Sequence, residues 1–446
     1  MSSKEWIPFV AANLSVNSAG ILELAGCDLQ KIANKYGTPV YIYDEDALRR
    51  QCQRYAKAGQ NYRPGVEAFY AAKAFLPLAM AELVNEEGLG IDVMSGGELY
   101  TALKAGVSPK RIYFNGNNKS PQELREAIKA GLGCIIVDNF FELELVGDLA
   151  QQAGITQPIQ LRINPGVEAH THEYIQTGQL DSKFGFPLLG EVAHRAAQVA
   201  ISHPNLNLLG FHCHIGSQIF ALDSYAAAVK TMLEFATEVK RQTGYTWEEL
   251  NLGGGLGIRY TEEDTPKTVE ELVANIISFV STGCAEYNLP LPKILLEPGR
   301  SIVGETGLTL YTIGSIKTIP GIRTYVAVDG GMPDNPRVAL YQAKYSAVIV
   351  NKADQKPNTL VSVAGKCCES GDMLIWDILL ATPESGDLLA LFSTGAYTYS
   401  MASNYNRLPK PPVVFCSNGT DRLVVRRETY QDLLACELSL KPGRLA

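Results

Sequence analysis

The chain alternates short strand-like runs with helical stretches, and this alternation constrains its fold more than any other feature. Runs rich in β-branched and aromatic residues are separated by amphipathic stretches of roughly 10 to 20 residues, a pattern typical of parallel strands joined by helices. The expected strands are VEAFYAA, GIDV, RIYF, CIIV, IQLRI, LLGFHC, ELNLG and KILLE. Eight strand and helix units favour closure into a (β/α)8 barrel.

The pattern changes after Arg300, where runs such as TLYTIGSIKTI, RTYVAVDGG and RLVVRRETY replace the long helical stretches. This change predicts a second, mainly β domain. We therefore expect an α/β protein with a barrel at residues 46–303 and a C-terminal β domain at 304–446. Residues 1–45 are expected to form an N-terminal segment that packs with the β domain. A chain of 446 residues is long enough for two cores.

Composition excludes several classes of function. The chain carries 39 basic and 47 acidic residues, a net charge of -8, and no lysine- or arginine-rich block that could follow a phosphate backbone. No apolar run resembles a membrane span, and the N-terminal MSSKEWIPFV lacks the hydrophobic core of a signal peptide. Nine scattered cysteines suit reduced thiols. We expect a cytoplasmic protein without nucleic-acid or membrane partners.

The ends of the predicted barrel strands carry the residues that a reaction would need. Catalytic groups of βα barrels lie at the C-terminal ends of the strands. In chain order these ends carry Lys73, SGGE (Ser95 to Glu98), FNGNN (Phe114 to Asn118), Asp138 and Asn139, Arg162 and Asn164, HCHIGSQ (His212 to Gln218), GGG (Gly253 to Gly255) and EPGR (Glu297 to Arg300). Such a set at one rim predicts an active site there.

Lys73 stands alone in the apolar run VEAFYAAKAFLPLAMAELV. Burial disfavours the charged form of a lysine and lowers its pKa, which yields an amine able to attack a carbonyl group. The alternative is that the stem packs in the core while the ammonium group reaches water. The other residues at the rim favour the reactive lysine.

The triple glycine and Glu297 extend this hypothesis to a cofactor. Backbone N–H groups of a glycine-rich loop converge on an anion, and loops after the seventh and eighth barrel strands commonly bind phosphate. The same glycines are also compatible with a tight turn that needs no ligand. With Lys73 they suggest pyridoxal 5'-phosphate, held through an imine to the lysine, with Glu297 as the carboxylate for the ring nitrogen.

Two His-x-His pairs leave a second chemistry open. We expect one of His212 and His214 in the core and the other at the rim, where His214 lies next to a glycine-serine loop. With His170 and His172 they allow a metal-dependent hydrolase. The predicted strand ends offer no matching acidic partners, so we expect no metal.

An ordered set of motifs runs nearly from end to end of the chain. It consists of FYAAK, VMSGGE, FNGNNKS, INPGV followed by SKFGF, HCHIGSQ, NLGGGLG, EPGR, CCESGD and GAYTYSMASNYN. In these motifs the chain resembles the fold type III, alanine racemase-like decarboxylases, and EPGR with the last two motifs resembles their diaminopimelate branch. Departures from the family pattern are Phe75 where asparagine is frequent, Asn115 where histidine is common, and a doubled cysteine.

The resemblance implies roles for individual residues. Lys73, His214 and Cys368 would be catalytic, with pyridoxal phosphate on Lys73 and His214 stacked on its ring. The implied cofactor-binding residues are Lys73, His214, Ser217, Gly254, Gly255, Glu297, Gly299, Arg300 and Tyr397. The implied substrate-binding residues are Arg300, Arg337, Tyr341, Glu369 and Tyr397. Cys368 and Glu369 would reach the site across a head-to-tail homodimer interface.

The implied reaction converts meso-2,6-diaminopimelate to L-lysine and carbon dioxide, the last step of lysine synthesis. A bidentate arginine suits the distal carboxylate of this substrate, and Arg337 is the candidate. Other fold III decarboxylases act on ornithine, arginine or carboxynorspermidine and would need an acidic residue there. A non-catalytic, cofactor-binding regulator is a further alternative. The thiol is Cys367 or Cys368, and adjacency to Glu369 in the Cys-Glu-Ser pattern favours Cys368.

Overall fold

The computed structural model of the protein describes residues 13–167 and 181–440. Within these residues the chain divides into two compact units. The barrel unit comprises residues 49–167, 181–258 and 265–301. The β unit comprises residues 13–48, 259–264 and 302–440.

The barrel unit contains the predicted closed sheet of parallel strands. Its barrel strands are β5 (Val66–Ala71), β6 (Gly90–Val93), β7 (Ile112–Phe114), β8 (Cys134–Val137), β9 (Gln157–Asn164), β11 (Leu206–His212), β12 (Glu249–Asn251) and β13 (Lys293–Leu296). Neighbours in this order pair in parallel, and β13 pairs with β5 to close the barrel. A short strand, β10 (Phe186–Pro187), adds to β9. The structure confirms the predicted (β/α)8 barrel.

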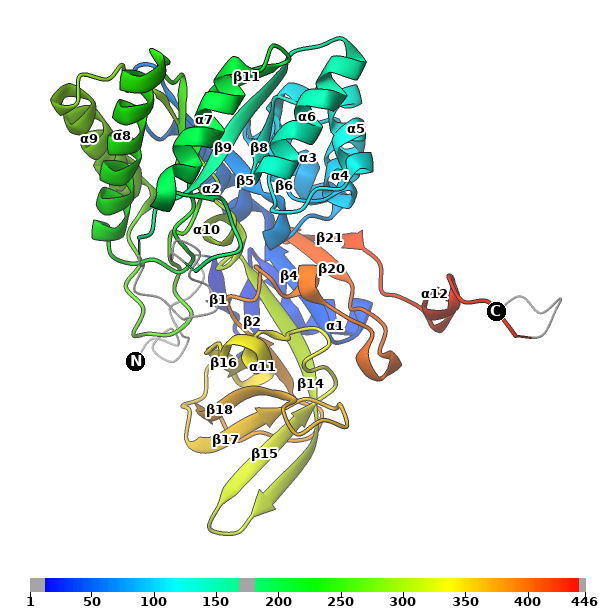
Figure 1. Ribbon diagram of the computed structural model, residues 1–446. Helices are drawn as coiled ribbons and strands as arrows, with labels where there is room; N and C mark the ends of the chain where they lie inside the picture. The colour runs from blue at the N-terminus through cyan, green and yellow to red at the C-terminus, as the bar shows by residue number, and fades with distance from the viewer. Residues whose placement is uncertain (1–12, 168–180, 441–446) are drawn as a thin grey trace. The chain divides into compact units, whose positions relative to one another are not determined.

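Helices alternate with these strands and lie outside them (Figure 1). They are α2 (Glu45–Lys57), α3 (Leu78–Glu86), α4 (Gly96–Lys104), α5 (Pro121–Ala130), α6 (Phe140–Ala153), α7 (Val192–Ser202), α8 (Asp223–Thr243), α9 (Val269–Glu286) and the short α10 (Arg300–Val303). Some polar residues that follow the strands begin these helices. Ser95 and Asn139 accept hydrogen bonds from backbone amides as N-caps of α4 and α6. These two side chains therefore have a structural role at the rim.

The β unit is built on a mixed sheet. Its elements are β1 (Leu14–Val16), β2 (Leu22–Leu24), β3 (Cys27–Asp28), α1 (Leu29–Tyr36), β4 (Val40–Asp44), β14 (Gly307–Ile319), β15 (Arg323–Val328), α11 (Arg337–Tyr341), β16 (Ala347–Ile349), β17 (Thr359–Ala364), β18 (Met373–Leu380), β19 (Leu388–Leu391), β20 (Val413–Ser417), β21 (Thr420–Val425) and α12 (Tyr430–Leu434). The main path runs β18-β17-β15-β14-β4-β20-β21. The second, mainly β domain is thereby confirmed.

Strand β4 shows how the N-terminal part of the chain joins this sheet. It pairs antiparallel with β14 on one side and parallel with β20 on the other, so it is an inner strand. Buried apolar side chains from the first and last parts of the unit, including Leu22, Leu310 and Val414, form one core. No helix among the described residues is long and apolar enough to span a membrane.

Candidate active site

Lys73 lies just beyond the C-terminal end of β5, in a single 3-10 turn (Ala72–Ala74). Its neighbours Ala72, Ala74 and Phe75 are buried, and the Tyr70 hydroxyl donates to the Phe75 carbonyl at 2.6 Å across the turn. The Lys73 side chain itself is exposed. The expectation that the apolar run buries this lysine was therefore wrong, because the run turns at its end and directs the side chain out of the core.

The Lys73 ammonium group acts electrostatically on other groups of the barrel unit, which include Asp92, Glu98, His214 and Glu297. Burial first, and then the charge of Lys73, lower the pKa of the His214 imidazole well below its ordinary value, so His214 is neutral. The same positive charge helps to lower the pKa of Glu297, and it opposes the rise in the Asp92 pKa that burial and Glu297 cause. The lysine thus lies at a place where it interacts with the ends of β6, β11 and β13.

Glu297 follows β13 and is a buried carboxylate with several donors. Asn251 Nδ2 donates to its Oε1 at 2.8 Å, and His212 Nε2 lies 3.2 Å from its Oε2. Burial alone would raise the Glu297 pKa, but His212, Asn251 and Lys73 outweigh it and the pKa lies below its ordinary value. Burial lowers the pKa of His212, so a neutral imidazole donating through Nε2 fits the contact. Glu297 is therefore an ionised carboxylate inside the barrel.

Glu297 belongs to a layer of buried polar side chains near the ends of the barrel strands. The layer consists of Asp92, Asn115, Asp138, Arg162, His212, Asn251 and Glu297. Arg162 Nη1 lies 3.4 Å from Asn115 Oδ1, and Asn115 Nδ2 lies 3.5 Å from Glu297 Oε2. Burial and the nearby charge of Glu297 raise the Asp92 pKa well above its ordinary value, so that carboxyl is protonated. Sequence reasoning missed Asp92 and Asn251 as parts of the site.

The predicted glycine loop lies where backbones approach each other closely. A Cβ atom on Gly254 would overlap the Glu297 carbonyl, and one on Gly255 would lie 2.7 Å from the Gly216 carbonyl oxygen. Gly255 also has a φ of 119°, a left-handed value that favours glycine. The Glu297 amide donates to the Gly253 carbonyl at 2.8 Å. The loops after β11, β12 and β13 are therefore held side by side by glycines that no larger residue can replace.

Arg300 and Ser217 lie beside these loops and contact each other. Arg300 donates to Ser217 Oγ from Nε at 3.2 Å and from Nη2 at 2.9 Å. Arg300 is buried, and Ser217 is half-buried. Gly299 allows this segment to approach β5, because a Cβ there would lie 3.1 Å from the Cβ atoms of both Ala71 and Ala74. Cationic, hydroxyl and glycine groups thus gather at one part of the rim.

This set of groups fits pyridoxal phosphate in three respects. An exposed lysine amine stands at one strand end, and an ionised carboxylate, Glu297, is held by fixed donors at a neighbouring one. At Gly254 and Gly255 the neighbouring loops leave no room for a side chain, and a glycine-rich backbone of this kind can offer N–H groups to a phosphate. The residues present therefore suit the cofactor that the sequence predicted.

Arg337 begins helix α11 in the β unit and is buried. Its Nη1 donates to the hydroxyl groups of Tyr260 and Tyr345 at 2.9 and 2.8 Å, and its guanidinium group lies 5.1 Å from the Tyr260 ring centre. Despite burial, these two phenols raise the Arg337 pKa, so the side chain is a permanent cation. Tyr341, at the end of the same helix, is half-buried.

The two adjacent cysteines of the β unit differ in their surroundings. Burial and the neighbouring Asp372 raise the pKa of Cys367 to about 12, which makes it a poor source of thiolate. Cys368 and Glu369 are exposed, and the Cys368 amide donates to Asn406 Oδ1 at 3.0 Å. The accessible thiol of the pair is Cys368.

Tyr397 has a strained backbone. Its φ is 60°, a left-handed value that is rare for a bulky residue, and its neighbours Ala396 and Thr398 are fully buried. Strain of this kind persists where the surrounding structure fixes it and is frequent at functional sites.

The site residues expected from sequence thus form two sets, one in each unit. His170 and His172 lie outside the described residues.

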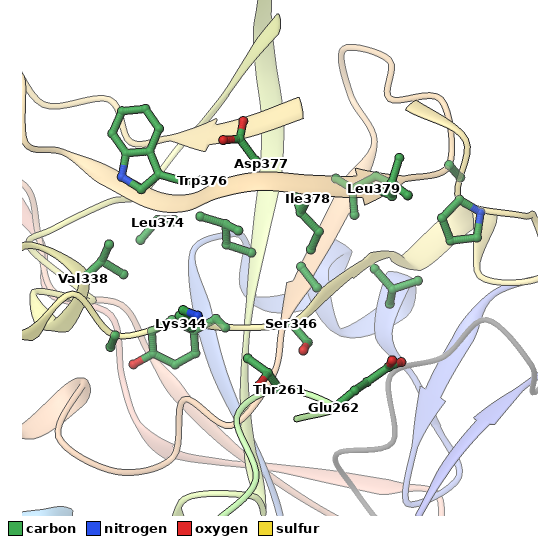
Figure 2. A pocket seen from close by; sticks show the side chains of 18 of the residues that line it. Thr261, Glu262, Val338, Lys344, Ser346, Leu374, Trp376, Asp377, Ile378 and Leu379 are labelled. Atoms are coloured by element: carbon green, nitrogen blue, oxygen red, sulfur yellow. The ribbon is translucent and has the colours of Figure 1, made fainter. Parts of the chain in front are cut away.

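The β unit also contains a groove of about 1040 Å³ that sequence reasoning did not predict. Figure 2 shows it between β18, with Leu374, Ile378 and Leu379, and the segment that carries Thr261 and Glu262. Next to it, Leu360, Trp376 and Leu379 are more than half exposed on β17 and β18. β18 is the outermost strand of the main sheet path, so this face combines an open strand edge with exposed apolar side chains.

Comparison with known proteins gives the class to which this arrangement belongs. Residues 45–304 match the pyridoxal-binding domain of the pyridoxal-dependent decarboxylases. The matched range covers more than half of the chain and contains Lys73, Glu297 and the glycine loops. The barrel is accordingly the cofactor-binding domain of a pyridoxal-dependent decarboxylase.

The chain belongs to the diaminopimelate decarboxylase family. It is 51% identical over 427 residues to the diaminopimelate decarboxylase of Bacillus subtilis (strain 168), which covers 96% of this chain and 97% of that protein. A crystal structure of the M. jannaschii diaminopimelate decarboxylase in complex with L-lysine matches 98% of this chain and 99% of its own, with a TM-score of 0.89 and 34% identity. The Helicobacter pylori enzyme with L-lysine gives a TM-score of 0.84 at 32% identity, covering 92% of this chain and 99% of its own.

Proposed function

We propose that the protein decarboxylates meso-2,6-diaminopimelate to L-lysine and carbon dioxide, with pyridoxal 5'-phosphate as cofactor, as the last step of lysine biosynthesis. The observation that carries this proposal is the full-length membership of the diaminopimelate decarboxylase family at 51% identity, with Lys73 and Glu297 at the ends of adjacent barrel strands. The enzyme is thus a carboxy-lyase.

Lys73 and Glu297 act at opposite ends of the cofactor in this proposal. Lys73 Nζ would hold the cofactor at its aldehyde end. Pyridoxal phosphate supplies an electron sink for the electron pair that the departing carboxylate leaves behind. Glu297, ionised and held by Asn251 and His212, keeps a proton on the ring nitrogen through a charged hydrogen bond worth about 1.5 to 3 kcal/mol.

The other cofactor-binding residues fix the position of the group. The His214 imidazole, whose pKa is lowered by burial and by Lys73, would contact the cofactor ring as a neutral group without adding a competing positive charge. The phosphate would be held by backbone amides and the arginine among Ser217, Gly254, Gly255, Gly299 and Arg300. Tyr397, whose backbone is strained, would bind both phosphate and substrate.

Substrate recognition falls to Arg300, Arg337, Tyr341, Glu369 and Tyr397. Arg337 is a permanent cation whose Nη1 is fixed by two tyrosine hydroxyls, so it is oriented before substrate arrives. A cation suits the distal carboxylate of diaminopimelate and repels the cationic end of ornithine or arginine. This charge favours diaminopimelate over the substrates of the related fold III decarboxylases.

A proton must replace the lost carboxylate on the reacting carbon. Cys368 Sγ is the proposed donor, with Lys73 Nζ as the other group able to deliver it. Cys368 is exposed whereas the Cys367 thiol is shielded beside Asp372, which supports Cys368 as the site thiol. An intact Lys73 and Cys368 also favour an enzyme over a non-catalytic regulator.

We further propose that two chains form a head-to-tail homodimer in which Cys368 and Glu369 complete the site of the partner. The open edge of β18 and the exposed Leu360, Trp376 and Leu379 support an interface on this face of the β unit. Exposure of Cys368 and Glu369 within the single chain agrees with a role toward a neighbouring subunit.

The proposal is tested by adding meso-diaminopimelate to the purified protein with and without pyridoxal phosphate and measuring carbon dioxide and lysine. We expect release of both in equal amounts, dependent on the cofactor, and its loss in Lys73→Ala. Turnover of ornithine, arginine or carboxynorspermidine instead would assign the protein to another branch of the fold III decarboxylases. Bound cofactor without turnover of any of these would indicate a regulator.

A further inference from the structure

We propose that Asp372 is a positioning residue that fixes the Cys368 and Glu369 loop for the reaction, an inference that rests on the proposed function. The loop, residues 365–372, connects β17 to β18. Asp372 is its last residue and is buried, although Cys368 and Glu369 before it are exposed. Burial of a carboxylate costs free energy unless hydrogen-bond donors compensate for the lost water. The donors that bind Asp372 should therefore show why it is buried at the base of this exposed loop.

The topology of the β unit brings a second segment to this loop. β15 and β17 pair in parallel, with Tyr325 opposite Ser362 and Ala327 opposite Ala364. Parallel strands end at the same edge of a sheet, so the turns that follow them lie side by side. The Lys366 amide accordingly donates to the Gly330 carbonyl at 2.9 Å.

The Asp372 carboxylate joins the two turns. Oδ2 accepts from the Cys367 amide at 2.7 Å, and Oδ1 accepts from the Met332 amide at 2.6 Å. We call these three groups the Asp372 clamp. One end of the clamp is the residue before Cys368, and the other lies five residues before Arg337. A single carboxylate therefore fixes two of the three segments that are proposed to carry substrate-binding groups in the β unit, the third being the one that contains Tyr397.

Packing around the carboxylate shows that the clamp has little freedom. A Cβ atom on either Gly331 or Gly365 would overlap the Asp372 carboxylate. The backbone adds further bonds within the loop, from Gly365 N to Asp372 O at 2.8 Å and from Asp372 N to Glu369 O at 3.1 Å. Asn406 Oδ1 accepts from the Cys368 amide and holds the tip of the loop. The position of the Cys368 backbone is thus set by fixed acceptors on both sides.

The chain contains a matched control for this carboxylate. Residues 369–372 and 384–387 share the sequence ESGD, and Asp387 is also buried. Asp387 accepts from the Glu384 amide, from Asn351 Nδ2 and from Lys352 Nζ, each at 2.8 Å. It stabilises a turn that carries no proposed site residue. Loss of Asp387 therefore reports the effect of removing a buried turn carboxylate on stability alone.

The test compares Asp372→Asn with Asp387→Asn in the cofactor-loaded enzyme. An amide side chain offers one acceptor and places a donor against one of the two backbone N–H groups. We expect hydrogen exchange of the peptides that contain Met332 and Cys367 to accelerate by about tenfold in Asp372→Asn only. We expect kcat for carbon dioxide release to fall by about tenfold to a hundredfold in Asp372→Asn, and by less than about twofold in Asp387→Asn. Cofactor content stays unchanged in both variants.

Gly365→Ala gives an independent route to the same result, because its Cβ displaces the carboxylate without removing it. It should reproduce the loss of kcat, and the double variant with Asp372→Asn should be no slower than the slower single one. Equal losses of kcat in Asp372→Asn and Asp387→Asn, additive losses in the double variant, or unchanged exchange at Cys367 would each overturn the proposal. Failure of the wild-type enzyme to release carbon dioxide refutes the proposed function instead, while the exchange measurement still decides whether the clamp exists.

Discussion

At the scale of single residues, the barrel separates the charge states of two buried carboxyl groups. Glu297 has donors on both oxygens and a pKa below the ordinary value. Asp92 lies in the same layer, where burial together with the charge of Glu297 outweighs Lys73 and Asn115 and raises its pKa. One carboxylate and one neutral acid result, which concentrates the negative charge on Glu297, the residue that we propose for the ring nitrogen of the cofactor.

The importance of that charge is measured by Glu297→Gln, which keeps the shape and removes the charge. We expect kcat to fall by about tenfold to 150-fold, the equivalent of a charged hydrogen bond of about 1.5 to 3 kcal/mol. Glu249→Gln is the control. Glu249 is a buried acidic residue at the N-terminal end of β12, away from the strand ends that carry the proposed site, and Tyr113 and Gln160 donate to it. Equal losses of kcat in the two variants would show that the charge of Glu297 has no special role.

Sequence predicted part of this residue-scale picture. Lys73 and Glu297 follow apolar strands, so their place at the strand ends could be read directly. The exposure of the Lys73 side chain could not be predicted from the sequence, because a run of apolar residues does not reveal where the chain turns within it. Asn251 and Asp92 are buried inside very short strands, and a three- or four-residue strand is too short for its sequence to show which side chains face the barrel interior.

At the scale of elements, the glycine loop after β12 brings three strand ends together. Gly254→Ala places a Cβ against the Glu297 carbonyl and forces the loops apart. We expect weaker pyridoxal phosphate binding, by about tenfold or more in Kd, since a shift of about 1 Å in a positioning loop has effects of this size. Equilibrium dialysis of the cofactor against wild type and variant measures this change.

Gly97→Ala provides the matching control within the same rim. Gly97 is in the first turn of α4, and the nearest atom to its Cβ, Ser95 Oγ, would be at an ordinary distance of 3.8 Å. Alanine in a helix is more favourable than glycine, so this variant should bind the cofactor as wild type does and be at least as stable. Unaltered cofactor binding in Gly254→Ala would contradict the assignment of this loop to the phosphate.

The two ESGD turns show why elements are easier to predict than their partners. Sequence identifies both as turns through their Gly-Asp pairs, and both are turns in the structure. Their difference lies in contacts with distant segments: Asp372 binds Met332, and Asp387 binds Asn351 and Lys352. Local pattern contains no information about those pairings, which arise from the order of strands in the sheet.

At the scale of the whole molecule, the proposed site residues divide between the two units, with Lys73 in one and Cys368 in the other. A head-to-tail homodimer would place Cys368 of one chain at Lys73 of its partner. Under this arrangement a heterodimer of Lys73→Ala and Cys368→Ala chains has one site that lacks both residues and one site that is intact. Closed twofold symmetry makes the two sites otherwise equivalent.

We therefore expect each variant to be nearly inactive by itself and the purified heterodimer to recover about half of the wild-type rate. Co-expression of the two chains with different affinity tags isolates the heterodimer, and light scattering establishes its mass. If Cys368 served Lys73 of its own chain, both sites of the heterodimer would lack one residue and no activity would return. The ratio of the heterodimer rate to the wild-type rate therefore distinguishes shared sites from separate ones.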